Sequence, residues 1–225
     1  MTESSVTSRN PILGVARRAD GAMRTVAVFL AGVNRIAPDL KGSRFLDVGC
    51  GDGTFTCQIA KDFVEVHGVD VQSEYAADFS AKGCGSFHAV SSSSMPFPDR
   101  YFDAVLALET LEHVDDLRGT AREISRVIKL GATLILSVPN RWYPIEGHGG
   151  IILGRDFSRL PLVTWVPPLH RRIAKARVFT VRDLDRLFGP LGFRRTKLGY
   201  LWPTFEHGAN TSYLRIQKAF RWLYP

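Results

Sequence analysis

Ten residues, Leu46 to Phe55, constrain the fold of this chain more than any other segment. They begin as an apolar, β-branched run and continue through three glycines in the order G-x-G-x-G. Glycine adopts positive φ without strain and leaves no side chain between the backbone and a ligand. A helix-like stretch follows from Gly53 or Thr54, so its first N–H groups would face whatever binds at the turn. The segment therefore predicts a strand, a tight turn and a helix that bring the backbone into contact with a ligand.

The spacing of these glycines distinguishes between nucleotide ligands. In the dinucleotide fingerprint G-x-G-x-x-G the third glycine would fall at Thr54, but here it is Gly53. Asp47 precedes the turn, where a carboxylate would repel a pyrophosphate and suit an ammonium or sulfonium group. The segment resembles the first motif of class I S-adenosylmethionine-dependent methyltransferases, hydrophobic-(D/E)-x-G-x-G-x-G. The resemblance implies a binding loop for S-adenosylmethionine made of Asp47, Gly49, Cys50, Gly51 and Gly53.

Length and composition indicate a globular protein. The chain has 225 residues, of which 45% are hydrophobic and 23% charged, which suits one domain with a sizeable core. We expect a flexible N-terminus over residues 1–20 and a single domain over 21–225. No apolar run approaches the length of about 20 residues that a membrane span needs, and the N-terminus lacks the apolar core of a signal peptide. A cytoplasmic location is therefore expected, in which Cys50, Cys57 and Cys84 are free thiols.

From residue 43 onward, predicted strands and helices alternate. This pattern predicts an α/β fold, a Rossmann-like, doubly wound, mostly parallel sheet with helices on both faces. The predicted strands lie near residues 43–48, 64–70, 85–89, 102–108, 131–138 and 192–200. The predicted helices lie near residues 22–37, 54–61, 72–82, 113–129 and 180–188, with a terminal amphipathic helix over 211–224. If the chain ends in this helix, the seventh strand of the resembled family is missing or very short, and the predicted sixth strand becomes an exposed edge of the sheet. A homodimer through the C-terminal region is one way to cover that edge.

Two further segments carry the resemblance to the cofactor site. Asp70, with its neighbour Val71, ends the second strand, where a carboxylate can accept both ribose hydroxyls. Residues 91–103 resemble the family pattern D-A-x-x-L-P-F-x-D-x-x-F-D. In that pattern Ser91 replaces the aspartate that contacts the adenine amino group, and Ser92 replaces the small residue after it. Met95 is expected to pack on the adenine ring, although a plain core position explains it as well.

The fourth strand leads into a segment, Ala107 to Val114, that resembles the signature M-E-V-L-E-H-V of ubiquinone and menaquinone methyltransferases. Leu108 replaces the methionine near the cofactor. His113 is expected to open the next helix, whose N-terminus disfavours the imidazolium form. A neutral imidazole there could act as a general base or simply cap the helix.

An insertion over residues 141–178 follows the fifth strand, and in the resembled family such insertions form a lid over the substrate. Glu146 and His148 lie in its glycine-rich start, where an acid and an imidazole could deprotonate or orient an acceptor hydroxyl. Two polar residues on a surface loop are the plainer alternative. His170 and His207 are assigned no role. No metal is required for in-line methyl transfer, and no ligand set for one is visible in the sequence.

The charge of the chain bears on its partners. The net charge is +7, and residues 151–180 hold six basic side chains against one acidic side chain. The apolar stretch 160–169 precedes part of this basic cluster, which favours a small-molecule or amphiphilic substrate and peripheral contact with an anionic membrane. The tetrapeptide N/D-P-P-Y of DNA amino-methylases and the Pro-Cys of cytosine-C5 enzymes are absent, so DNA is not expected as a partner, whereas RNA stays open.

These observations predict an enzyme that transfers a methyl group from S-adenosylmethionine to a small-molecule or lipid-like acceptor, with S-adenosylhomocysteine as the product. O- or C-methylation fits better than methylation of nucleic acid. Because Ser91 departs from the family pattern, the alternative is a catalytically inactive, S-adenosylmethionine-binding regulatory or partner protein.

Overall fold

The structure is a computed structural model that describes residues 19–157 and 160–201. The chain divides into two units, one of residues 33–198 and one of residues 1–32 with 199–225. The first unit contains the sheet, the insertion and every candidate site residue predicted above.

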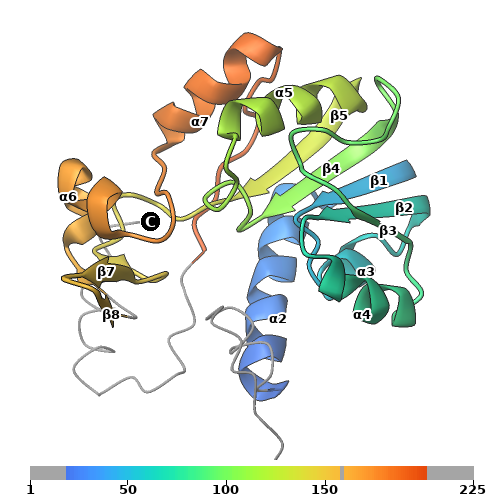
Figure 1. The fold of residues 1–225 in the computed structure, drawn as a ribbon. Helices are drawn as coiled ribbons and strands as arrows, with labels where there is room; N and C mark the ends of the chain where they lie inside the picture. Colours follow the sequence, from blue (N-terminus) through green and yellow to red (C-terminus); the bar gives the residue numbers. More distant parts are fainter. Residues whose placement is uncertain (1–18, 158–159, 202–225) are drawn as a thin grey trace, which may run out of the picture. The chain divides into compact units, whose positions relative to one another are not determined.

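The sheet has the predicted parallel, doubly wound topology (Figure 1). Its strand order is β3-β2-β1-β4-β5, and all four pairings are parallel. Because the strands run in the same direction, their carboxyl ends meet at one edge, where ligands of such sheets bind. The strands are β1 Gly42–Val48, β2 Phe63–Asp70, β3 Ser86–Ala89, β4 Phe102–Leu108 and β5 Ile128–Ser137.

Helices lie on both faces of the sheet, as predicted, but several are shorter than expected. The helix after the glycine turn is a single turn, and the helix predicted from residue 113 begins only at Leu117, where the side chain of Asp116 accepts a hydrogen bond from Gly119 N. His113 therefore does not open a helix, and the expected effect of a helix N-terminus on its imidazole is wrong. The helices are α2 Ala19–Ile36, α3 Thr56–Ile59, α4 Ala76–Ala81, α5 Leu117–Val127 and α7 Val181–Phe188, with 3₁₀ turns at Ser73–Tyr75 and Gly189–Leu191.

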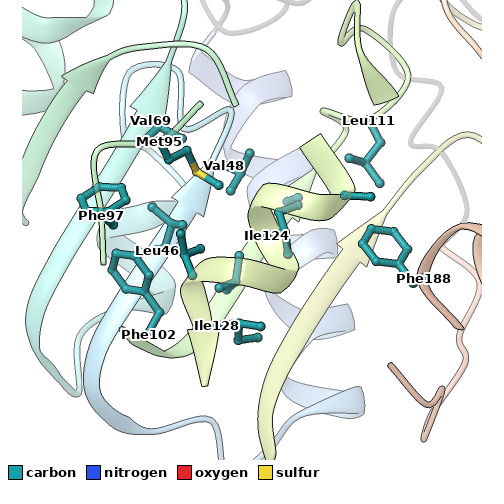
Figure 2. Packing of buried hydrophobic residues seen from close by; sticks show 14 of the residues in the cluster. Leu46, Val48, Val69, Met95, Phe97, Phe102, Leu111, Ile124, Ile128 and Phe188 are labelled. Carbon is teal, nitrogen blue, oxygen red and sulfur yellow. The ribbon is translucent and has the colours of Figure 1, made fainter. Parts of the chain in front are cut away.

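Side chains that alternate along β1 and β4 supply the core on both faces. Leu46 of β1, Ile124 of α5 and Phe188 of α7 belong to one buried cluster on one face of the sheet (Figure 2). The next residue back, Phe45, packs with Val33 on the other face. This alternation is what a strand buried on both sides requires, since successive side chains point in opposite directions.

Two predictions at the end of the chain have different outcomes. The predicted sixth strand over 192–200 is wrong, because these residues form no strand. Phe193 instead turns back onto Phe188 of α7, with ring centroids 5.4 Å apart, and the residues after it are exposed. The helix predicted over 211–224, the missing seventh strand and the dimer through this region lie outside the described residues.

The insertion forms two short antiparallel strand pairs, β6 with β9 and β7 with β8, and a helix beyond the carboxyl ends of β4 and β5 (Figure 1). Its two ends are held together, since Phe179 N donates to Pro139 O at 2.9 Å and Arg141 N donates to Phe179 O at 2.9 Å. Arg177 N donates to Glu112 O at 3.1 Å, which fastens the insertion to the loop after β4. Its elements are β6 Ile145–Glu146, β7 Gly150–Ile152, β8 Arg155–Phe157, β9 Leu160–Pro161, a 3₁₀ turn at Val163–Trp165, and α6 Pro167–Ile173.

Cysteine pairing differs from the prediction. Cys57 on α3 and Cys84 before β3 form a disulfide, and only Cys50 remains free, buried in the glycine turn. The sequence did not predict this pairing, because the two cysteines are 27 residues apart and lie on separate segments, α3 and the turn between α4 and β3.

The disulfide should stabilise the fold. We expect the double substitution Cys57→Ser, Cys84→Ser to lower the free energy of unfolding by about 3 kcal/mol, because the bridge restricts the unfolded chain. Urea unfolding of both proteins, with and without dithiothreitol, measures this. Dithiothreitol should affect only the wild type. Three free thiols titrated in the native wild type would contradict the pairing.

Candidate functional site

The glycine turn after β1 is held against the loop that follows β4. Gly49 has φ of 75°, and a Cβ at this position would lie 2.4 Å from Oγ1 of Thr110. Thr110 Oγ1 donates to Val48 O at 2.9 Å and lies 3.0 Å from Leu108 O. Gly49 is therefore required by the contact between the ends of two neighbouring strands, which brings the predicted cofactor loop beside the Glu109–Val114 segment.

The other two glycines of the turn have different surroundings. A Cβ on Gly53 would lie 2.6 Å from the ring of Phe79, so this glycine lets α4 pack close to the turn. Gly51, with φ of 51°, has no atom within 4 Å of such a Cβ. Open space above Gly51, next to backbone that carries no side chain, fits the close approach of a ligand that the motif predicts.

Asp70 lies at the end of β2 and faces this turn. Its Oδ2 accepts a hydrogen bond from Gly51 N at 3.0 Å and its Oδ1 accepts one from Gln72 N at 2.9 Å. A carboxylate has about four acceptor positions, so both oxygens can still accept hydroxyl donors. The residues present fit a ribose of S-adenosylmethionine here. Val71 next to it is exposed.

Asp47 lies beneath the turn and is almost completely buried, with 3% of its surface exposed. Thr56 Oγ1 donates to its Oδ2 at 2.6 Å. Burial raises the pKa of Asp47 to about 7, against the hydrogen bond from Thr56, which lowers it. A buried carboxyl of this kind would be stabilised as an anion by a cationic ligand group nearby.

The serines predicted at the adenine contact lie at the start of the loop between β3 and β4. Ser91 is exposed and its hydroxyl lies 2.9 Å from that of Ser93, while the Ser92 hydroxyl lies 2.9 Å from that of Thr120 in α5. Met95 is buried in the same core cluster as Leu46, so both of its predicted roles remain compatible with its position. Leu108 ends β4 and is half-buried.

A second group of side chains follows β4. Glu109 has φ of 50°, an unusual conformation for a residue other than glycine. This conformation turns its carboxylate toward Ser137 at the end of β5, whose hydroxyl donates to it. Glu112, three residues on, is 1% exposed, and neither of its carboxyl oxygens has a hydrogen-bond donor among the described residues. Burial and the charge of Glu109 raise the pKa of Glu112 well above its usual range.

The insertion contributes Glu146 and two histidines to the same place. Glu146 Oε1 accepts a hydrogen bond from His148 N at 2.9 Å and lies 3.3 Å from His148 Nδ1, and its Oε2 lies 2.5 Å from His170 Nε2. Burial alone would raise the pKa of Glu146, but the hydrogen bonds from His148 and His170 hold it below its usual range.

The two groups meet at Glu112. Its Oε1 lies 3.8 Å from His148 Nε2 and 4.0 Å from His113 Nε2, and the two imidazole rings are 5.2 Å apart. Burial and the charge of His148 lower the pKa of His113. The structure thus brings together all three residues predicted to be catalytic, Glu146, His148 and His113. We call Glu109, Glu112, His113, Glu146, His148 and His170 the acid–histidine cluster.

Sequence reasoning missed three members of this cluster. Glu109 and Glu112 were present in the strand-end motif but had been given no role, and only the spacing E-x-x-E-H could have drawn attention to them. His170 had no signal at all, since it meets Glu146 from 24 residues away. The expectation that no metal-ligand set is visible also changes, because one ligand atom each from Glu112, His113 and His148 lie within 4.8 Å of one another.

Comparison with known proteins agrees with this geometry. Residues 46–136, which span β1 to β5, match the family model described as a methyltransferase domain. Residues 46–136 form a class I S-adenosylmethionine-dependent methyltransferase domain. The fold of the methyltransferase domain agrees with solved structures: an S-adenosylmethionine-dependent methyltransferase from Mesorhizobium loti has a TM-score of 0.57 at 18% identity, over 73% of this chain and 80% of that chain.

Two curated relatives illustrate the similarity of the methyltransferase domain. O-methyltransferase rstn1 of Aspergillus nomiae is 36% identical over 107 residues, covering 44% of this chain and 47% of that protein. Ubiquinone biosynthesis O-methyltransferase of Azorhizobium caulinodans is 27% identical over 165 residues, covering 71% of this chain and 62% of that protein. The chain spans less than half the length of the first curated relatives that it matches.

The burial of Asp47 has a consequence for stability. In the unfolded chain this carboxyl ionises near its ordinary pKa of 3.8, and in the folded chain near 7. Between these values the folded state holds a proton that the unfolded state has lost, so the free energy of unfolding falls as pH rises through this range and is level above it. Asp47→Asn keeps a hydrogen-bond acceptor for Thr56 and removes the ionisable group, so its free energy of unfolding should not fall in this way as pH rises. Since each pKa unit corresponds to about 1.4 kcal/mol, the variant should gain a few kcal/mol over wild type between pH 4 and pH 8.

Urea unfolding at both pH values measures this difference. Asp78→Asn, at an exposed carboxyl on α4, is the matched control and should show the same difference from wild type at either pH. An equal difference at pH 4 and pH 8 for Asp47→Asn would contradict the shifted ionisation.

Proposed function

We propose that this chain transfers the methyl group of S-adenosylmethionine to a hydroxyl of an apolar or lipid-like small molecule, and that it does so at the surface of an anionic membrane. The observation that carries the proposal is the contact between Thr110 and Gly49, because it sets the acid–histidine cluster beside the glycine turn. S-adenosylmethionine supplies a methyl group on a positively charged sulfur, which is already activated for displacement.

On the cofactor side of the site, the residues of this chain contribute by positioning the cofactor. The carboxylate of Asp70, which the amide of Gly51 orients, holds the ribose of the nucleoside. Leu108, at the end of β4, is expected beside the methyl group. The glycine turn leaves backbone rather than side chains at the ligand. In-line displacement depends mainly on such positioning, because the acceptor must lie about 3 Å from the methyl carbon and collinear with the bond that breaks.

The acid–histidine cluster supports an acceptor with an ionisable hydroxyl rather than a carbon or an already basic nitrogen. A hydroxyl must lose its proton to attack, and His148 has an Nε2 directed into the cluster while its Nδ1 faces Glu146. This is the arrangement of an imidazole oriented by a carboxylate, in which the carboxylate fixes the ring and its other nitrogen is available to the substrate. Glu146 is therefore a positioning residue, and His148 and His113 are the candidates to accept the proton.

The outer surface of the insertion favours an amphiphilic acceptor and an anionic membrane. Large apolar side chains are exposed along it, and Leu153 is 98% exposed at the tip of the β7–β8 hairpin, with φ of 49°. Exposed arginines, Arg171 and Arg172, lie on α6 close by in sequence. An apolar surface beside basic side chains suits an anionic lipid surface. The exposed apolar residues are Trp142, Ile151, Leu153, Phe157, Leu162, Trp165, Val166 and Leu169.

This surface is compatible with peripheral membrane binding, as the sequence predicts. The Cys57–Cys84 disulfide, however, does not favour the cytoplasmic location, for which three free thiols were expected. No helix among the described residues is long and apolar enough to cross a membrane.

Binding of the cofactor is tested by calorimetry. Asp70→Ala should weaken the affinity for both S-adenosylmethionine and S-adenosylhomocysteine about tenfold or more, because a hydrogen bond to a charged group contributes about 1.5–3 kcal/mol. Glu74→Gln, at an exposed acid four residues further on, is the matched control and should bind as wild type does. No binding of either compound by the wild type would refute the central claim.

Turnover is tested by release of S-adenosylhomocysteine with a panel of hydroxylated aromatic compounds, each with and without an alkyl tail. We expect the tailed compounds to be methylated on oxygen, and Glu146→Gln to lower kcat with little effect on cofactor affinity, because the His148 ring loses its orienting charge. Cofactor binding without turnover on any hydroxyl acceptor would refute O-methylation.

Membrane contact is tested by flotation with vesicles that contain anionic phosphatidylglycerol. The wild type should float with these vesicles at low salt but not with phosphatidylcholine alone, and Leu153→Asp should lower the bound fraction several-fold. Leu130→Asp, at an apolar residue exposed to 80% near the start of β5, is the matched control and should float like the wild type. No flotation at low salt would refute this part of the proposal.

A further inference from the structure

We propose that Glu112, His113 and His148 bind a divalent transition-metal ion of the zinc type, which leaves one coordination position open for the acceptor oxygen. Binding of the ion is independent of methyl transfer. Only the role given to the open position rests on the proposed function.

The positions of the ligand atoms fit one ion. Glu112 Oε1 lies 3.8 Å from His148 Nε2 and 4.0 Å from His113 Nε2, and one ligand atom from each residue lies within 4.8 Å of the others. Zinc binds nitrogen and carboxylate oxygen at about 2.0–2.2 Å, so two ligand atoms in a tetrahedral site are about 3.4 Å apart. The two pairs that include Glu112 would close by roughly half an ångström, and the pair of histidine nitrogens, which lie within 4.8 Å of each other, by at most about 1.4 Å. Rotation of the three side chains can supply these movements.

Glu112 is the independent observation that points to a cation. It is buried, and no donor among the described residues reaches either oxygen. Glu109 and Glu146 are close enough that both charges act on it. A buried carboxyl without a donor is costly unless it is protonated or paired with a positive charge. A divalent ion would supply that charge and satisfy the unpartnered oxygens.

The surroundings of His148 match those of a histidine that ligates a metal. Histidine ligands usually direct the ring nitrogen that faces away from the metal toward a carboxylate or carbonyl, which fixes the tautomer and the ring orientation. Here Nδ1 lies 3.3 Å from Glu146 Oε1, and Nε2 faces Glu112. Glu146 is in turn held by His148 N and by His170, which is itself buried. The carboxylate behind the ligand is thus fixed from two sides.

The donor set selects the class of ion. Two imidazole nitrogens and one carboxylate oxygen are the ligands of catalytic zinc sites, which keep a fourth position for water or substrate. Imidazole also suits cobalt, nickel and iron, whereas magnesium and calcium prefer ligands that are all oxygen. The side chain of His113 is 40% exposed, so the ion would be reached from the side of that ring.

An ion at this place would replace the imidazoles as the group that activates the acceptor, because His148 and His113 would bind the ion through Nε2 and could not accept the proton. A hydroxyl oxygen bound at the open position has a lowered pKa, so its proton passes to solvent water and the oxygen keeps the electron pair with which it attacks the methyl carbon. The carbon–oxygen bond then forms as the carbon–sulfur bond breaks, and the electron pair of that bond remains on sulfur.

Two other sources of positive charge would also relieve Glu112. One is a proton shared between Glu109 and Glu112, whose carboxyls interact directly. The other is the sulfonium group of the cofactor. Metal binding measured in the absence of cofactor and acceptor distinguishes a metal ion from both of these sources.

The test is calorimetric titration of chelator-treated protein with zinc chloride, together with the visible absorption of the cobalt complex. We expect one equivalent to bind with micromolar or tighter affinity, and cobalt to give the intense visible bands of a tetrahedral site. Glu112→Gln and His148→Gln should each weaken binding at least about tenfold. Magnesium should bind far more weakly than zinc.

A second histidine–acid group of the same protein supplies the control. His67 and His88 lie 2.9 Å apart beside Glu65, but Glu65 already pairs with Arg44. His88→Gln should therefore leave zinc binding unchanged. His113→Gln, at the more exposed ligand, should also weaken zinc binding. This variant tests the site if Glu112→Gln or His148→Gln fails to fold, which thermal unfolding of each variant reveals.

The outcomes separate the two proposals. No zinc or cobalt binding by the folded wild type, or binding that Glu112→Gln leaves unchanged, overturns the metal site. If metal-free protein still binds S-adenosylmethionine and methylates a hydroxyl acceptor, the proposed function stands without the ion. If the protein binds zinc but not S-adenosylmethionine, the metal site stands and the proposed function fails.

Discussion

The contact of Thr110 with the backbone of Val48 and Gly49 is the interaction on which the site depends. The β1 and β4 strands pair in parallel, so their carboxyl ends are neighbours, but neighbouring ends do not by themselves fix the loops that follow. Thr110 occupies the space that a Cβ on Gly49 would need and donates to Val48 O. The hydroxyl of Thr110, together with the absence of a side chain on Gly49, thereby fixes the position of the cofactor turn relative to the loop that contains Glu112.

How much of the structure could be predicted depends on how local its cause is. The parallel sheet and the turn around Gly49 follow from apolar runs and glycines that are adjacent in sequence, and both were predicted. The strand expected over 192–200 was wrong because its leading apolar residue, Phe193, finds its partner, Phe188, in the preceding helix rather than in the sheet. The pairing of Cys57 with Cys84 depends on the contact of α3 with the turn after α4, which no local sequence pattern predicts.

The site was predictable in its parts and not in its assembly. Glu146, His148 and His113 were identified from strand ends and a glycine-rich loop, but their convergence depends on Arg177 N bonding to Glu112 O and on the bridge between Pro139 and Phe179. These are backbone contacts between distant segments. The role of Glu112 could not be read from sequence for the same reason, since its significance lies in the absence of a donor around it in the described structure.

The insertion has opposite chemistry on its inner and outer sides, and this links the two halves of the proposed reaction. Glu146, His148 and His170 face inward and are held by one another, whereas Leu153 and its apolar neighbours are exposed. Because Arg177 fastens the segment to the loop after β4, its outer surface cannot move far without disturbing its inner one. An acceptor drawn from a lipid surface by the outer side would therefore reach a cluster whose geometry the same segment sets, so capture and activation of the acceptor are two consequences of one fold.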